Sequence, residues 1–229
     1  MKHEPFNEST EMYLKTVSEL AEDTGAQVPI SALAERMGVS NVSATEMIHR
    51  LKKQDLLDHQ PYKGVSLTPK GQIRATAVIR SHHMWECFLA GELGLSWEQV
   101  HDFACRLEHA TDTAVTEALA VYLGNPQTCP HGNPIPGPDG IIAFPDDVPL
   151  TSLQPGQSAT INRIFPESTL LLAYLAGREL KPGQTITFIE TAPFNGPLMV
   201  TCGAQTHALG HEIAAHLFVK ILPGVQENY

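Results

Sequence analysis

Residues 30–53 read ISALAERMGVSNVSATEMIHRLKK, and this stretch decides the fold of the first third of the chain. Apolar residues recur at helical spacing on both sides of Gly38, which is placed to end one helix. Ser40 is placed to cap the helix that follows. The stretch therefore predicts a short helix from Ile30 that ends at Gly38, a tight turn, and a longer helix over residues 41–53.

The neighbouring segments extend this pattern. Residues 11–23 have the apolar spacing of a preceding helix, and residues 56–58 and 65–67 read as short strands. A loop containing Pro61 and Gly64 joins the two strands, as in a small hairpin. Helix, short helix, turn, helix and hairpin follow one another as in a winged helix-turn-helix, which places its last helix in the major groove of DNA.

The charge distribution also indicates DNA as a partner. The 229-residue chain has a formal net charge of -10, which taken alone argues against nucleic acid. Residues 36–80, however, contain eight Lys/Arg and three Asp/Glu, a net charge of +5, whereas residues 81–229 contain five Lys/Arg and fifteen Asp/Glu. A basic segment of this size inside an acidic chain suits contacts with phosphates.

The candidate DNA-contacting residues lie on the helix over residues 41–53 and in the hairpin. Short donors and one long cation suit phosphates: Ser40, Asn41, Ser43, Thr45 and Arg50. Val42 would touch a thymine methyl group, and Glu46 would accept a hydrogen bond from cytosine. Lys52 and Lys63 are further phosphate candidates. Each of these residues, taken singly, also fits an ordinary solvated position.

Three further helices and a set of strands are predicted after the hairpin. The helices cover residues 68–89, a segment that contains residues 101–109 and begins at a capping box from Ser96 to Gln99, and residues 115–123. They carry more apolar surface than they can bury among themselves, which favours dimerisation. Residues 125–149 are rich in Pro and Gly and predict a linker or an extended ordered arm. Residues 157–164, 185–190, 198–202 and 217–222 predict the strands of a small β-barrel.

Metal-donor residues recur at helical spacing in this middle region. Cys105, Glu108 and His109 stand at positions i, i+3 and i+4, so a helix would project them from one side, with His101 one turn earlier. Three donor types within reach of one ion are typical of a metal site. If Cys105 is instead a core residue and the others form a salt-bridged face, no ion is needed.

A second pair of donors makes the metal interpretation stronger. His82 and Glu86 repeat the i, i+4 spacing about twenty residues upstream. A soft thiolate beside imidazole and carboxylate groups suits a borderline ion such as Fe²⁺ better than Mg²⁺ or Ca²⁺. The sequence has no Cys-x-x-Cys of the kind that structural zinc sites use. The joint pattern therefore favours a transition-metal ion.

Composition indicates a cytoplasmic protein with reduced thiols. No run approaches the roughly 18 to 20 apolar residues of a membrane span, and the N-terminus lacks the features of a secretory signal. The four cysteines are too widely spaced for a disulfide framework: Cys87, Cys105, Cys129 and Cys202. No membrane partner is expected.

Three functions are compatible with these residues. The first is a DNA-binding regulator that senses a metal ion through the donor pairs. The second is a thiol-redox-responsive DNA-binding regulator that responds to oxidation at Cys105, with the His and Glu residues serving structure. The third is a metalloenzyme, which is the weakest because no set of acid and base partners accompanies the donors.

The chain resembles the diphtheria-toxin-repressor family of iron- and manganese-dependent transcriptional regulators. The resemblance rests on STEMYL at residues 9–14, RSH at 80–82 with Glu86, VHD at 100–102, ACR at 104–106, EH at 108–109 and GNPIPG at 132–137. These motifs follow the family's order over about three-fifths of the chain. The C-terminal strands are similar to the family's SH3-like third domain, which ferrous-iron transport accessory proteins also contain.

The resemblance implies two metal sites per subunit. The residues that match the family's primary, activating site are Met12, Cys105, Glu108 and His109. Those that match its ancillary site are His82, Glu86 and His101, to which the third domain would add Glu167. Met and Cys are the ligands of the iron branch, so Fe²⁺ is expected, with Mn²⁺ as the alternative. Leu170 and Leu171 stand where the family has a Gln.

The resemblance also implies the domain organisation and the activity. We expect a fold that is mainly α with small β: a winged helix-turn-helix DNA-binding domain over residues 1–72, a helical dimerisation and metal-binding domain over residues 73–142, and an SH3-like domain over residues 143–229. The metal-loaded homodimer would bind a palindromic double-stranded DNA operator as a co-repressor type regulator of metal homeostasis genes. The apoprotein would bind poorly.

Overall fold

Helices dominate the first half of the chain and antiparallel strands the second half. The computed structural model describes residues 8–24 and 27–223. Six α-helices and a two-stranded hairpin precede residue 123, and a six-stranded sheet lies after residue 147. The prediction of a mainly α fold with small β is confirmed.

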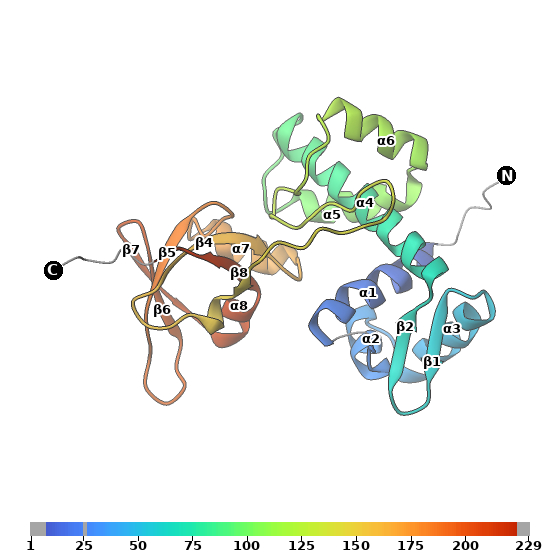
Figure 1. Cartoon of the computed structure of the whole chain (residues 1–229), viewed down its shortest axis with the longest axis horizontal. Coiled ribbons are helices and arrows are strands. Elements are labelled where there is room, and N and C mark those ends of the chain that lie inside the picture. The colour runs from blue at the N-terminus through green and yellow to red at the C-terminus, as the bar shows by residue number, and fades with distance from the viewer. Residues whose placement is uncertain (1–7, 25–26, 224–229) are drawn as a thin grey trace. The chain divides into compact units, whose positions relative to one another are not determined.

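Five elements form the predicted winged helix-turn-helix (Figure 1). They are α1 (Glu8–Thr24), α2 (Ile30–Met37), α3 (Asn41–Lys53), β1 (Leu57–Gln60) and β2 (Gly64–Leu67). Gly38 ends α2 with φ 64°, and the hydroxyl of Ser40 accepts a hydrogen bond from the backbone N–H of Ser43 at the start of α3. Both predicted helix boundaries are confirmed. The first helix begins three residues earlier than residue 11, the predicted start.

Backbone contacts fix the hairpin and the helix that follows it. Val28 and Val65 exchange two backbone hydrogen bonds, with N···O distances of 2.8 and 2.9 Å, which ties the segment before α2 to the wing through an isolated β-bridge. The helix α4 (Pro69–Gly91) then starts directly on this wing. A Cβ at Gly71 would lie 2.0 Å from the carbonyl oxygen of Leu56, so only glycine allows this approach.

The region after α4 departs from the prediction in two places. The helix predicted through residue 109 is wrong: α5 (Val100–Leu107) ends earlier, and a 3₁₀ turn, η1 (Glu108–Ala110), continues the chain before α6 (Thr113–Tyr122). The predicted capping box is also wrong. The backbone carbonyl of Ser96 accepts from the N–H groups of Gln99 and Val100, whereas its buried hydroxyl has no hydrogen-bond partner among residues 8–24 and 27–223.

The C-terminal domain is an antiparallel sheet with three short helices. Its strands are β3 (Val148–Pro149), β4 (Ser158–Ile164), β5 (Thr185–Thr191), β6 (Leu198–Cys202), β7 (Gln205–Leu209) and β8 (Leu217–Ile221), in the order β3-β8-β4-β5-β6-β7. The helices are η2 (Leu150–Ser152), α7 (Thr169–Ala176) and α8 (His211–Ala215). The four predicted strands are confirmed. The sequence analysis missed β7, an edge strand that is mostly exposed, and α7, whose nearly all-apolar sequence has no helical period.

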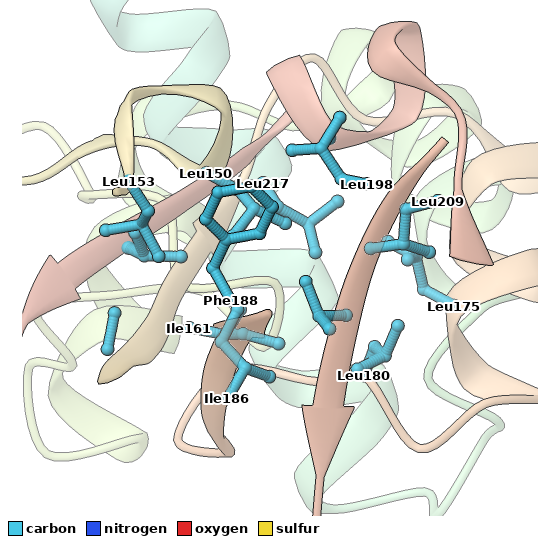
Figure 2. Close-up of a cluster of buried hydrophobic side chains, with 14 of the residues drawn as sticks. Leu150, Leu153, Ile161, Leu175, Leu180, Ile186, Phe188, Leu198, Leu209 and Leu217 are labelled. Atoms are coloured by element: carbon cyan, nitrogen blue, oxygen red, sulfur yellow. The ribbon is translucent and has the colours of Figure 1, made fainter. Parts of the chain in front are cut away.

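Figure 2 shows how the sheet closes around its own core. Leucine and isoleucine side chains from β4, β5, β6 and β8 converge with Leu175 of α7 and with Leu150, and Phe188 fills the centre. These residues are between 0% and 4% exposed. Burial of apolar surface on this scale is what holds a domain of about 80 residues together.

The chain divides into two compact units. The first comprises Met1–Met84, Cys105–Tyr122 and Pro136–Ile142, and the second comprises Trp85–Ala104, Leu123–Ile135 and Ala143–Tyr229. Long helix α4 runs from the first unit into the second. Among the helices within residues 8–24 and 27–223, none combines the length and the apolar content that crossing a bilayer requires.

Candidate metal centre and DNA-binding surface

Glu108 lies at the centre of a buried polar cluster in the first unit. Its side chain is fully buried, and its Oε2 atom lies 2.7 Å from the Nζ atom of Lys15. The same oxygen also contacts Nδ1 of His82, which is 1% exposed. Three elements therefore meet at one carboxylate: α1 through Lys15, α4 through His82 and η1 through Glu108 itself.

Glu11 and His109 complete this Glu108 cluster, which consists of Glu11, Lys15, His82, Glu108 and His109. The Nδ1 atom of His109 lies 2.8 Å from Oε2 of Glu11, and its Nε2 atom lies 3.1 Å from Oε1 of Glu108. The second contact is an ion pair without the geometry of a hydrogen bond, so both atoms are buried without a hydrogen-bond partner in the described chain. A metal-binding histidine usually donates a hydrogen bond from one ring nitrogen to a carboxylate, and its other ring nitrogen binds the ion.

The charged groups of the Glu108 cluster strongly shift one another's pKa values. Burial alone would raise the pKa of Glu108, but Lys15, His109 and His82 outweigh it, so this pKa is far below its ordinary range. Burial alone would lower the pKa of His109, but Glu108 and Glu11 raise it to about 9. Without a metal ion, the protonated ring of His109 and the ammonium group of Lys15 balance the negative charge of the carboxylates in this cluster.

The two sulfur residues of the predicted primary site belong to the same unit. Met12 is half-buried on α1, directly after Glu11 in the chain. Cys105 is a half-buried residue on the last turn of α5 that forms no disulfide bond, and its thiol interacts electrostatically with Lys15. The structure therefore brings the predicted Cys105, Glu108 and His109 into the unit that carries α1.

A second cluster of donors lies wholly within the second unit. His101 Nδ1 lies 2.9 Å from Oε2 of Glu167 and 3.4 Å from Oε1 of Glu86. His131 Nδ1 lies 3.2 Å from the same Glu86 oxygen and 3.4 Å from Oε2 of Glu167, and the Cys129 thiol donates to Oε1 of Glu167 over 3.5 Å. We call these five residues the Glu167 cluster. His82, predicted as a fourth ancillary donor, lies one helical turn before Glu86 on α4.

Cys129 and His131 are the donors that the sequence analysis missed. Both lie in the segment over residues 125–149, which forms an extended ordered arm rather than a loose linker, and both are buried. Nε2 of His131 lies 2.9 Å from the backbone oxygen of Trp97, which orients the ring. The tripeptide Cys129-Pro130-His131 was the available signal, but its partners Glu86 and Glu167 are about 40 residues away on either side.

Electrostatics of the Glu167 cluster favour a cation. Burial alone would lower the pKa of His131, but Glu167 and Glu86 raise it to about 10. Burial, together with Glu86 and Glu167, raises the pKa of the Cys129 thiol well above its ordinary value. The two carboxylates therefore hold a proton on His131, and a divalent ion could take the place of that positive charge.

The position expected to carry a Gln has no donor. Leu170 is 87% exposed, and Leu171 packs against the core of the C-terminal domain. The side-chain amide of Asn133 instead contacts Oε1 of Glu167 and the backbone oxygen of Ile164. Glu167 is thereby held in place by residues of its own unit.

The predicted DNA-contacting residues form a largely exposed surface on α3 and the hairpin. Eight of the nine side chains are exposed. Thr45 is half-buried, and its hydroxyl donates a hydrogen bond to the backbone oxygen of Asn41. Val42 is 69% exposed. Lys52 pairs with Asp58 of β1 over 3.1 Å. This surface presents Arg50 and Lys63 to solvent.

Both clusters fit a transition-metal ion by their donor chemistry. Glu108, His109, Cys105 and Met12 offer a carboxylate, an imidazole, a thiol and a thioether, and the Glu167 cluster offers two carboxylates, two imidazoles and a thiol. Ligand atoms of Glu86, His101 and Glu167 all lie within 4.8 Å of one another, as do those of Glu86, Cys129 and Glu167. Such mixed sets suit Fe²⁺, Mn²⁺ or Zn²⁺ more than Mg²⁺.

A winged helix-turn-helix, followed by helices rich in metal donors and an SH3-like sheet, defines the class of metal-responsive DNA-binding regulators. Comparison with known proteins agrees. Residues 5–65 match the N-terminal DNA-binding domain of iron-dependent repressors, residues 68–137 match their metal-binding and dimerisation domain, and residues 148–221 match the FeoA domain.

Individual relatives extend this match along the chain. The chain is 34% identical over 220 residues to the iron-dependent repressor IdeR of Mycobacterium leprae, covering 90% of this chain and 94% of that protein. It is 30% identical over 194 residues to the diphtheria toxin repressor of Corynebacterium diphtheriae, covering 80% and 85%. A solved manganese-dependent transcriptional repressor in complex with manganese is similar with a TM-score of 0.86 and 34% identity, covering 93% of this chain and 100% of that one.

The chain belongs to the iron-dependent repressor family, whose members include the diphtheria toxin repressor. It is a metal-dependent transcriptional repressor that binds DNA and forms dimers. The relatives and structural neighbours are repressors, so the metalloenzyme alternative is set aside.

Proposed function

We propose that this repressor is activated by Fe²⁺, with Mn²⁺ as the alternative ion, and that its dimer binds a palindromic operator. Its targets would be metal homeostasis genes. The sulfur atoms of Met12 and Cys105 support Fe²⁺, because thioether and thiolate ligands suit a softer ion than Mn²⁺ prefers. The relative named for iron is as similar in sequence as the neighbour named for manganese, so the donor set decides.

The observation that carries this proposal is that the DNA-binding region shares a buried charge cluster with the dimerisation region. Glu11 and Lys15 come from α1 of the winged helix-turn-helix, and they contact His109 and Glu108 of η1. In the first of two proposed sites, Met12, Cys105, Glu108 and His109 would hold the activating ion. Binding there would fix α1 relative to the dimerisation helices and so set the spacing of two α3 helices in a dimer.

The second proposed site takes its ligands from the Glu167 cluster. Glu86, His101 and Glu167 are the donors that the sequence predicted, and the contacts of His131 and Cys129 with these carboxylates support adding both. Since Glu86 lies on α4 and Glu167 precedes α7, an ion there would tie the C-terminal domain to the end of the dimerisation helix.

In the proposed mechanism, exposed side chains of α3 and the wing read the operator. Ser40, Asn41, Ser43, Thr45 and Arg50, with Lys52 and Lys63, would contact phosphates, and Val42 and Glu46 would face base edges. The proposed ligands come together only when α1 is correctly placed relative to the dimerisation helices. The ion therefore stabilises that arrangement through its positive charge. By linkage, operator binding must then raise metal affinity by the same factor as metal raises operator affinity.

The test is the affinity of the purified full chain for an operator fragment with and without Fe²⁺ under reducing, anaerobic conditions. We expect at least a 100-fold gain with the metal, and a Met12→Ala variant should need about 10-fold more metal for the same gain. Equal operator affinity with and without metal would contradict the proposal. A change that occurs only after oxidation would instead support the redox alternative through Cys105.

The second site is tested by metal stoichiometry. His131→Ala should lower the amount of Mn²⁺ bound per chain from two ions to one, while Trp97→Phe, which keeps the backbone oxygen that contacts His131, should leave it at two. Equilibrium dialysis with metal analysis measures the ratio. Two bound ions in the His131→Ala variant would exclude His131 as a ligand.

A further inference from the structure

The Glu108 cluster contains a buried cation that the proposed metal sites do not use. Lys15 on α1 is 6% exposed, and its Nζ atom lies 2.7 Å from Oε2 of Glu108. Lysine is almost never buried to this degree unless it is paired. Its partner is the carboxylate that the proposed function assigns to the activating ion.

Lys15 keeps its charge in this position. Burial alone would lower its pKa, but the carboxylates of Glu108 and Glu19 outweigh burial and raise this pKa above its ordinary value. His82 and the Cys105 thiol also face the same cluster, from α4 and α5. In the metal-free protein the ammonium group therefore lies 2.7 Å from the carboxylate that the ion would bind.

An ammonium group and a divalent ion compete for the same negative charge. Lys15 already pairs with Oε2 of Glu108, one of the oxygens that would bind the ion. If the ammonium group stayed 2.7 Å from this oxygen, it would lie next to the bound ion, and the two cations would repel each other with little water to screen them. Lysine is suited to leaving, because its charge sits on a flexible four-carbon stem.

Glu19 is placed to receive the displaced ammonium group. It lies on α1 four residues after Lys15, which is the spacing at which side chains on one helix face meet. Glu19 is half-buried, and its field already acts on Lys15. Besides Lys15, the positive charges that act on Glu19 are those of His82 and of Arg36 on α2.

We propose that Lys15 is a built-in competitor of the activating metal: it pairs with Glu108 in the metal-free protein and moves to Glu19 when a divalent ion binds. The inference rests on the proposed first metal site and deepens it. Lys15 sets how much metal is needed for activation, because every binding event must break the pair between Lys15 and Glu108. A cell with this repressor would respond only above that threshold.

The experiment measures Mn²⁺ affinity at the first site by competition with a chelator. The full chain carries Glu167→Gln in every sample, so that only the Glu108 cluster is read. Lys15→Met should bind Mn²⁺ at least about 10-fold more tightly, whereas Lys15→Arg, which keeps the charge, should not. Lys220→Met, an exposed lysine in β8, is the matched control and should leave the affinity unchanged.

Glu19 is tested in the same assay by a double-mutant cycle. Glu19→Gln alone should weaken Mn²⁺ binding by about 3-fold, because the ammonium group loses its second partner. In the Lys15→Met background the same change should have no effect. Equal effects in both backgrounds would show that Glu19 does not act through Lys15 and would overturn this part of the inference.

Other outcomes separate this inference from the proposed function. Unchanged or weaker Mn²⁺ binding by Lys15→Met would mean that Lys15 supports the site rather than competes, and would overturn the inference while the site stands. No Mn²⁺ binding by the parent chain would overturn the proposed site itself. Thermal unfolding of the metal-free variants checks folding. If Lys15→Met does not fold, Lys15→Gln, which keeps a donor but loses the charge, gives the same readout.

Discussion

At the scale of single residues, the sequence predicted donors but not the groups that orient them. Cys105, Glu108 and His109 were identifiable from their spacing and their resemblance to a known motif. Glu11 and Lys15, which contact His109 and Glu108, were not, because they lie more than 90 residues away in the chain on an ordinary amphipathic helix. Contacts at such separation follow from packing and leave no mark in local spacing.

Glu11 provides a prediction at this scale. Glu11→Gln should weaken metal binding at the first site by about 10-fold or more, because His109 loses the carboxylate that holds its ring with Nε2 toward Glu108. Isothermal titration with Mn²⁺ in the Glu167→Gln background measures the change. Glu8→Gln, an exposed position on the same helix, is the control. Equal affinities for the two variants would remove Glu11 from the support of the site.

At the scale of elements, side-chain periodicity predicted most helices and strands, and it failed where other forces decide. The helix through residue 109 breaks at Glu108, whose carboxylate turns inward to Lys15 and His82. The strand β7 was missed because an edge strand with exposed side chains has no apolar alternation. The helix α7 was missed for the opposite reason, since apolar residues on nearly all sides remove the period.

Arg80 joins three elements of the first unit and provides a prediction about pH. It makes a two-pronged ion pair with Glu117 of α6, at 2.7 and 2.9 Å, and donates to the backbone oxygen of Pro136 over 2.8 Å. Arg80 lowers the pKa of Glu117 below its ordinary value of 4.5. Because the folded-state pKa is lowered, the pair contributes stability above about pH 4.5 and loses it as the pH falls through the folded-state pKa.

Glu117→Gln should therefore destabilise the protein at pH 7 and have little effect in more acidic solution. Glu117 is partly exposed, so solvent screening limits the loss to about 1 kcal/mol in the free energy of unfolding. Urea unfolding at pH 7 and at pH 3.5 measures both values. The prediction is wrong if the difference between the variant and the parent chain grows as the solution is acidified.

At the scale of the whole molecule, the order of domains was readable from the sequence, whereas the second cluster of donors was not. Winged helix, donor-rich helices and SH3-like sheet follow from patterns that each lie within one segment. The Glu167 cluster draws on α4, α5, the arm over residues 125–149 and the segment before α7. Residues this far apart in the chain share no local pattern, so only the folded structure shows that they lie close together.

DNA binding by the dimer provides a prediction at this scale. Arg50 is exposed on α3, and each copy that contacts a phosphate releases about one counterion. Arg50→Ala should therefore lower the slope of log affinity against log salt by about two for a dimer, and should weaken binding to all sequences alike. Fluorescence anisotropy across a salt series gives the slope. Lys220→Ala, outside this surface, should not change it, and an unchanged slope for Arg50→Ala would remove Arg50 from the phosphate contacts.

The close approach of Gly71 to the carbonyl oxygen of Leu56 has a consequence for genetics. Any larger residue at position 71 would push the start of α4 away from the wing, although it touches no metal donor and no DNA-facing side chain. We expect a screen for strains that express the target genes constitutively to recover substitutions at this glycine. The proteins from such strains would still bind metal at the Glu167 cluster, yet would release their promoters.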